Sequence, residues 1–152
     1  MRNLLFTIFT VLMVMAFAND KNRTVEKRNP KVTVKGKTKA HKIIMGIPKK
    51  YPNDAVQIQK AVLKDDKVTL TVSYSGGAKK HEFKLYASKG IKESYPAQIH
   101  VVLSHNANGD AAEAYITRDV IFDISVLKKH APIVLHIRAN GMKKAVSVTL
   151  KK

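Results

Sequence analysis

Three side chains that could carry acid–base or metal chemistry are brought together by the order of the chain. His81 opens one stretch of alternating apolar residues, and His105 closes another. If these stretches are neighbouring antiparallel strands, the start of the first lies beside the end of the second, next to a loop with Asn106 and Asp110. Imidazole and carboxylate groups placed together could bind a metal or exchange protons with a substrate. Histidines at strand ends more often hydrogen-bond loop carbonyls, and we favour that role.

The loop after the second histidine also faintly resembles a calcium loop. It has the order Asn106-x-Asn108-Gly109-Asp110, with one carboxylate where tight calcium sites use several. Elsewhere the chain has no phosphate-binding glycine loop, no nucleophile elbow and no paired zinc ligands. We therefore predict no cofactor, no catalytic residue and no metal, with His81, His105 and Asp110 as weak metal candidates.

The elements that must position these groups are short strands, because apolar and polar residues alternate from residue 55 to the end. Turn signals at Asp65-Asp66, Gly76-Gly77 and Asn140-Gly141 separate the strands, and one helical turn is predicted at residues 125–130. Seven or eight strands without a long helix predict an all-β fold: an antiparallel immunoglobulin-like β-sandwich, with a small β-barrel as the alternative. The predicted strands are 56–62, 67–75, 81–87, 99–105, 114–124, 133–137 and 146–150.

The chain divides into three parts by composition. Residues 1–18 combine Arg2, an apolar run and the small-x-small ending Ala16-Phe17-Ala18, which is typical of a cleaved signal peptide. Residues 19–50 are predicted to be a basic arm with one or two edge strands, and residues 51–152 the sandwich domain. Later apolar runs are too short to span a membrane. We therefore predict an exported chain, periplasmic or extracellular, with no transmembrane segment after cleavage.

The basic arm concentrates the charge of the chain. The whole sequence has 28 Lys or Arg against 11 Asp or Glu, a formal net charge of +17. Residues 19–50 hold eleven Lys or Arg against Asp20 and Glu26, a net charge of +9. Lysine is a hydrated point charge, so its excess over arginine favours an anionic polymer or surface over specific reading of nucleic acid. The same charge also promotes solubility. The predicted anion-binding residues are Lys35, Lys37, Lys39, Lys42, Lys49 and Lys50.

Two motifs point to a family. Residues 73–83 read Ser-Tyr-x-Gly-Gly-x-x-x-His-x-Phe, and residues 105–110 read His-Asn-x-x-x-Asp. They resemble a poorly characterised family of exported or lipid-anchored β-sandwich proteins from Bacteroidetes-type bacteria, over residues 55–126. The resemblance implies fold and export but no activity. It also implies cysteines at the positions of Ala78 and Ala112, where this cysteine-free chain would replace a disulfide between two loops by a small apolar contact.

These observations favour a non-enzymatic binding or accessory module for an anionic partner. That partner is expected to be a glycan, lipopolysaccharide, a membrane surface or an acidic protein. Two alternatives stay open. One is a metal-assisted hydrolase built on His81, His105 and Asp110, and the other is a structural accessory protein without a ligand. The sequence does not set the oligomeric state.

Overall fold

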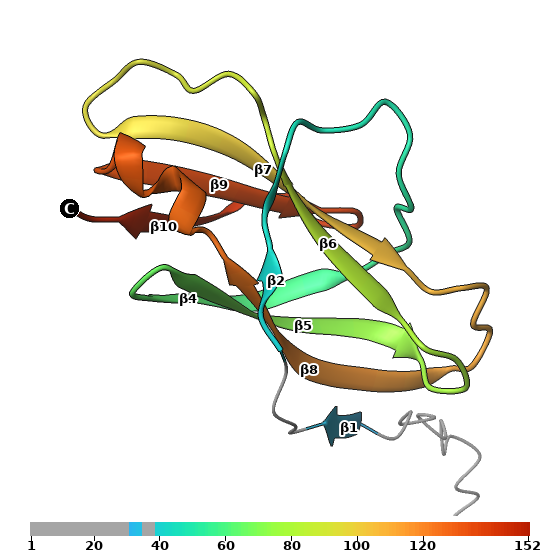
Figure 1. Ribbon diagram of the computed structural model, residues 1–152. Helices are drawn as coiled ribbons and strands as arrows, with labels where there is room; N and C mark the ends of the chain where they lie inside the picture. The colour runs from blue at the N-terminus through green and yellow to red at the C-terminus, as the bar shows by residue number, and fades with distance from the viewer. Residues whose placement is uncertain (1–30, 35–38) are drawn as a thin grey trace, which may run out of the picture.

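The computed structural model describes residues 31–34 and 39–152, which form a two-layered β-sandwich (Figure 1). Seven of the described strands, β4 to β10, have five or more residues, so the predicted all-β sandwich is confirmed. The elements are β1 (Lys31–Val34), β2 (His41–Lys42), β3 (Ile44–Met45), β4 (Gln57–Lys64), β5 (Lys67–Gly76), β6 (Glu82–Ala87), β7 (Ala97–Asn106), β8 (Ala114–Asp123), the 3-10 helix η1 (Ser125–His130), β9 (Ile133–Ala139) and β10 (Val146–Leu150).

The two sheets are mixed rather than purely antiparallel. The first has the order β1-β8-β5-β4 with β2 also on β8, and the second has the order β10-β9-β7-β6-β3. The pairs β4–β5, β5–β8, β6–β7 and β9–β10 run antiparallel, as predicted. The pairs β1–β8, β2–β8, β3–β6 and β7–β9 run parallel. The β7–β9 pair is parallel because the chain crosses to the other sheet as β8 and returns through η1 to the end where β7 began.

The core lies between the sheets and consists of the alternating apolar residues. Leu70 on β5 and Phe122 on β8 are fully buried in one cluster with Leu85 on β6 and Leu103 on β7. Burying one such side chain contributes about 1.5–3 kcal/mol relative to its exposure. These residues fix which face of each strand points inward, and they thereby set the direction of the residues two positions away.

The register of β4 shifts between Ile58 and Lys60. Lys60 is the position at which the alternation in the sequence breaks. A β-bulge of this kind changes the face that the following residues present. The sequence irregularity therefore marks a real feature of the strand.

Residues 39–50, which we call the edge segment, join the two sheets along one side of the sandwich. Its strand β2 pairs with β8 in one sheet, and its strand β3 pairs with β6 in the other. Between them Ile43 is buried, and its backbone N–H donates to the carbonyl of Asp123 at 3.0 Å. The C-terminal part of the predicted basic arm is thus tied to the sandwich by backbone pairing and by a buried side chain.

Residues 1–30 and 35–38 lie outside the described residues. The predicted signal peptide at residues 1–18 and the candidates Lys35 and Lys37 are among them. In the part of the chain that the structure describes, no helix has the length and apolarity to cross a membrane.

Candidate functional site

The structure brings His81, His105 and Asp110 together in one hydrogen-bonded chain. Nδ1 of His81 lies 2.8 Å from Nε2 of His105, and Nε2 of His81 lies 3.1 Å from Oδ2 of Asp110. At the other end, Nδ1 of His105 lies 3.1 Å from the carbonyl oxygen of Ala55. The predicted pairing of the two strands produces this arrangement, because β6 and β7 pair with Phe83 opposite His105. The expected bond from a strand-end histidine to a loop carbonyl is confirmed for His105.

Asp110 is held by backbone N–H groups from two loops. Its Oδ2 accepts hydrogen bonds from Gly77, Ala78 and Lys79 at 2.8, 2.9 and 2.8 Å. Its Oδ1 accepts a bond from the N–H of Ala112 at 2.9 Å. These donors, that of Ala112 foremost and then that of Lys79, hold the pKa of Asp110 well below its usual range. The carboxylate is therefore ionised at neutral pH, and it ties the β5–β6 turn to the loop that precedes β8.

The hydrogen-bonded chain needs three protons for its three bonds. Both of its ends, the Ala55 carbonyl and the Asp110 carboxylate, can only accept. Two neutral imidazoles supply two N–H protons, so one histidine is an imidazolium when all three bonds are made. Burial, and after it the charge of His81, lowers the pKa of His105. His105 therefore favours the neutral ring, with its proton on Nδ1 facing the Ala55 carbonyl.

Aromatic rings enclose this pair and separate it from water. The ring of Tyr74 stacks on His81 with centroids 4.4 Å apart, and the ring of Phe83 stacks on His105 at 4.8 Å. The side chains of His81 and Asp110 are 2% and 0% exposed, and His105 as a residue is 2% exposed. Stacking on an aromatic face also stabilises a desolvated cation. The site is a buried, charged link between loops.

Gly76, the last residue of β5, makes room for the link. A Cβ atom at this position would overlap the imidazole of His81, with Cε1 at 2.6 Å, and would lie 3.1 Å from Oδ2 of Asp110. Glycine lets a backbone approach other groups this closely. The Gly-Gly pair therefore serves the packing of the site as well as the turn.

The geometry does not suit a metal ion. Each ring nitrogen of His81 and His105 already has a protein partner, and both oxygens of Asp110 accept backbone N–H groups. Among the described residues, no group of three or more His, Cys, Asp or Glu side chains is arranged to hold a metal. The resemblance of the loop to a calcium site does not hold, because its one carboxylate turns toward the β5–β6 turn.

Asn106 lies beside the hydrogen-bonded chain and shapes the loop. Its Oδ1 accepts the backbone N–H of Asn108 at 3.0 Å. Asp54, which sequence reasoning missed, accepts the N–H of Ala107 at 2.7 Å. No local pattern marks Asp54, because its partner is 53 positions further along the chain. Together with the bond from Lys79 Nζ to the carbonyl of Gly109 at 2.9 Å, these contacts hold the loop in place.

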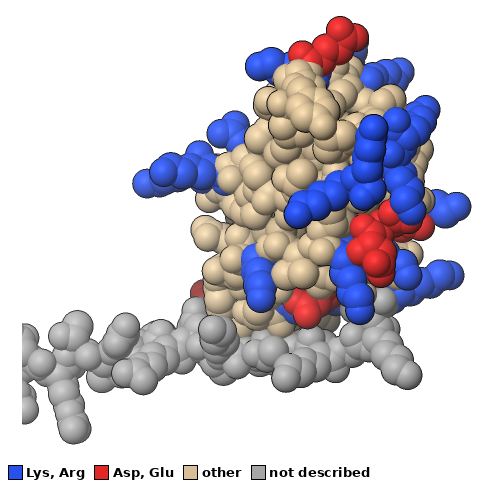
Figure 2. Space-filling model, turned by 90° about the vertical axis from the view of Figure 1, so that its left-hand side faces the viewer, with Lys and Arg blue, Asp and Glu red and all other residues tan. Residues whose placement is uncertain are grey.

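Four of the six predicted anion-binding lysines are in the edge segment, and all four are exposed: Lys39, Lys42, Lys49 and Lys50. We call them the lysine quartet. Figure 2 shows one face on which Lys and Arg side chains project at many levels while Asp and Glu are confined to a few places. Among the described residues, the lysine that forms an ion pair with an aspartate is Lys128, whose Nζ lies 3.0 Å from Oδ2 of Asp66, and it is not a member of the quartet. The structure therefore leaves the quartet free to meet an external anion.

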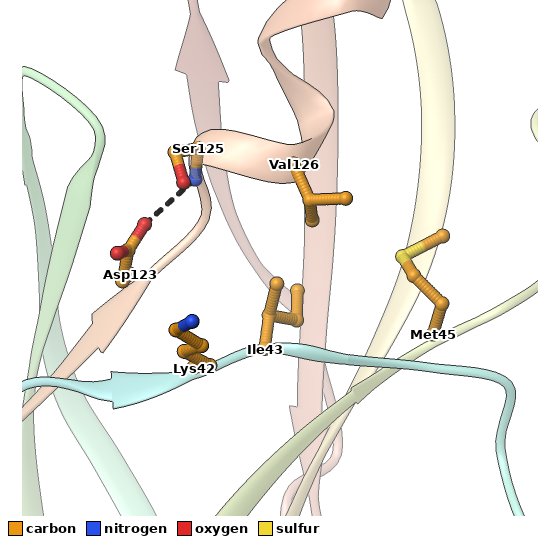
Figure 3. A pocket seen from close by; sticks show the side chains of 6 residues that line it. All are labelled: Lys42, Ile43, Met45, Asp123, Ser125 and Val126. Carbon is orange, nitrogen blue, oxygen red and sulfur yellow. Dashed lines mark hydrogen bonds between the residues drawn. The ribbon is translucent and has the colours of Figure 1, made fainter.

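A cavity of about 410 Å³ adjoins the quartet (Figure 3). Lys42, Ile43 and Met45 line it from the edge segment, and Val126 lines it from η1. Asp123 is turned to the start of η1, where it accepts the backbone N–H of Ser125 at 2.9 Å. Ser125 hydrogen bonds lower the pKa of Asp123, so this wall keeps a negative charge beside Lys42.

Two solved structures are similar to this chain. A protein of unknown function from Bacteroides vulgatus ATCC 8482 matches 76% of this chain and 57% of its own, with 18% identity and a TM-score of 0.54. A NigD-like immunity protein from Bacteroides caccae ATCC 43185 matches 72% of this chain and 58% of its own, with 16% identity and a TM-score of 0.50. This chain spans less than two thirds of either structure, and at these identities the likeness supports the fold alone.

No curated protein matches the chain. The model of the NigD-like C-terminal beta sandwich domain matches residues 39–151. The match includes the edge segment, the buried histidine pair and all strands from β2 to β10. The chain therefore belongs to the family of the NigD-like C-terminal beta sandwich domain.

Proposed function

We propose that this chain is an exported, non-enzymatic binding module that attaches to an anionic partner at the cell envelope. The observation that carries the proposal is the exposed lysine quartet in a chain whose net charge is +17. Lys42 lies beside Asp123, and the four lysines together still present an excess of positive charge to an external polyanion. Such attraction brings a partner to the surface quickly and without strict geometry.

The position of the quartet supports a continuous binding edge. Lys39 precedes β2, Lys42 is its second residue, and Lys49 and Lys50 follow β3. Backbone pairing with β8 and β6 holds this segment in place. An ordered row of cations loses less conformational entropy on binding than a free tail would. A glycan, lipopolysaccharide, a membrane surface or an acidic protein could meet it.

Export is supported by the sequence of residues 1–18 and by the family. The apolar run and its small-x-small ending are typical of a signal peptide. A similar structure carries the description of a NigD-like immunity protein, a role that also depends on binding. In the periplasm or outside the cell, envelope polyanions are the accessible partners.

The hydrolase alternative has weak support. His81 and Asp110 have almost no exposed side-chain surface, and both nitrogens of His105 are bound within the protein. A general base must come within hydrogen-bonding reach of its substrate. Here the ring nitrogens of both histidines and both oxygens of Asp110 already have partners within the protein.

The experiment that tests the proposal is elution from immobilised heparin and from immobilised lipopolysaccharide in a salt gradient. One variant replaces the quartet by glutamine at Lys39, Lys42, Lys49 and Lys50. A control of equal net charge replaces Lys143, Lys144, Lys151 and Lys152. We expect the quartet variant to elute at clearly lower salt than the control, because screening acts on the cations that touch the polymer. Equal elution of the two variants would contradict a binding edge.

A second candidate function is attachment to a partner protein. Met45 and Val126 line the cavity beside Lys42 and are 39% and 46% exposed, and Ile44, next to Met45 in the chain, is 41% exposed. Exposed apolar residues rimmed by charge are typical of protein interfaces. The test is a pull-down from an envelope extract with the unaltered chain and with Met45→Asp and Val126→Asp. An acidic protein that the unaltered chain retains and both variants lose would support this second function. Retention of the same protein by both variants would contradict it.

A further inference from the structure

Arg118 breaks the apolar row on the inner face of β8. Its neighbours two positions away, Ile116 and Val120, are buried in the core, and alternation along a strand puts Arg118 on the same face. Its Nε atom is shielded from solvent and has no hydrogen-bond partner. A shielded, unpaired guanidinium nitrogen costs free energy. The guanidinium group can therefore meet a ligand only through its terminal nitrogens.

A cavity of about 390 Å³ lies next to this arginine. On one side β6 pairs with β7 along its whole length, and on the other side β3 pairs with Tyr86 and Ala87, so the cavity lies beside the unpaired edge of the first residues of β6. β6 and β8 belong to the two facing layers of the sandwich (Figure 1). The lining residues are His41, Lys80, His81, Glu82, Phe83, Lys84, Arg118 and Val120.

The lining is strongly cationic. Arg118, Lys80 and Lys84 stand against the single carboxylate of Glu82. Within the described part of the chain, none of these three cations is in an ion pair. Cations gathered in a concave site attract an anion more strongly than cations spread over a convex surface.

The cavity is larger than one oxyanion needs. Its volume is within the usual range for pockets that hold small organic ligands. Phe83 and Val120 give it apolar wall, and the His41 ring gives it a planar one. A guanidinium binds an oxyanion through two parallel hydrogen bonds, and since Nε is shielded, the two terminal Nη nitrogens of Arg118 suit the anionic end of a ligand. The apolar wall formed by Phe83 and Val120 suits an organic ring attached to that anionic end.

We propose that this cavity binds an oxyanion carried by a sugar-sized organic group, either a phosphate or a carboxylate. Arg118 holds the oxyanion in a two-bond fork, and Lys80 and Lys84 neutralise its charge from the rim. The site differs from the lysine quartet and does not depend on it. The quartet meets an extended polyanion, whereas this cavity takes one anionic unit.

The test uses three probes: inorganic phosphate, glucose 6-phosphate and glucuronate, each titrated at constant ionic strength against chloride. The first readout is the NMR signals of the terminal Nη–H groups of Arg118 in the unaltered chain. We expect them to shift downfield on binding, since they donate hydrogen bonds to the bound oxyanion. Stronger binding of the two sugar probes than of inorganic phosphate is expected from the size of the cavity. Equal affinity for all three probes would overturn the proposal that the ligand carries an organic group.

Variants place the binding at the arginine. Arg118→Met and Arg118→Lys should each weaken binding by about tenfold or more, because a charge-assisted hydrogen bond is lost. Lys143→Met removes one exposed charge elsewhere and should leave the affinity unchanged. The quartet variant should also bind the probes normally, which separates this proposal from the proposed function. Unmoved Nη–H signals, or equal affinity of Arg118→Lys and the unaltered chain, would overturn the site.

Discussion

Nδ1 of His81 and Nε2 of His105 lie 2.8 Å apart, and the two rings are nearly parallel, with 21° between their planes. This bond joins the start of β6 to the end of β7. Asp110 continues the link to the loop before β8. The residues that first suggest catalysis thus form an internal connection that holds one end of the sandwich together.

Protonation of the pair can be read by NMR. At pH about 6, the nitrogen shifts of His105 should be those of a neutral imidazole with its proton on Nδ1. The reason is that burial lowers the pKa of His105 and that the Ala55 carbonyl opposite Nδ1 can only accept. A His105 with its proton on Nε2 in place of Nδ1 would contradict this arrangement.

Lowering the pH should remove two stabilising contributions in succession. The pKa of His105 is lowered in the fold, below the unfolded value of about 6.5. Its contribution to the free energy of unfolding is therefore present above pH about 6.5 and is lost as the pH falls through the lowered pKa. The pKa of Asp110 is lowered too, so its contribution is complete above its unfolded pKa of about 3.9 and is lost below it. Denaturant midpoints measured from pH 8 to pH 3 check this.

Asp110→Asn should destabilise the domain, because an amide cannot accept four backbone N–H groups as the carboxylate does. We expect the melting temperature to fall on the order of 10 °C. Asp65→Asn is the matched control, since Asp65 lies in a turn at φ 53°, a conformation that asparagine tolerates. A similar small change for both variants would show that the link contributes little.

Gly76→Ala should destabilise by about 1–3 kcal/mol, because its methyl group overlaps the ring of His81. Gly90→Ala is the control, since a Cβ atom there meets nothing within 4 Å. Chemical denaturation of both variants gives the comparison. Equal stability of Gly76→Ala and the unaltered chain would mean that the imidazole is not held against β5.

Ala78→Cys combined with Ala112→Cys should form a disulfide. One carboxylate, that of Asp110, binds the backbone N–H groups of both residues, and the family resemblance places cysteines at these positions. Closure of this loop should add about 2–4 kcal/mol to the free energy of unfolding. Mass spectrometry and denaturation with and without reductant measure it. Two free thiols after mild oxidation would argue against the correspondence.

Much of this arrangement could be predicted from alternation. The inward parity of Phe83 and Leu103 placed His81 and His105 on one side of the sheet, and the antiparallel pairing of β6 with β7 then brought them together. The direct bond between the two rings could not be predicted, because it depends on a register that is correct to one residue. Asp110 could be placed near the site, but its contacts with four backbone N–H groups depend on loop geometry.

The edge segment and the cavity were harder to predict. β2 and β3 have two residues each, too few to show alternation, so the sequence could not assign them to different sheets. Arg118 did give a signal. It is the charged residue in an otherwise apolar inward row, and sequence reasoning passed over it because its neighbours across the cavity come from β2 and β6.

The most direct test of the proposed function is the salt dependence of binding to vesicles that contain lipopolysaccharide. The dissociation constant of the unaltered chain should rise steeply with salt, because bound cations release counterions. By analogy with nucleic acids, replacing the lysine quartet by glutamine should reduce the slope of log Kd against log salt by about three to four. The control at Lys143, Lys144, Lys151 and Lys152 should keep the original slope. An unchanged slope in the quartet variant would contradict the account.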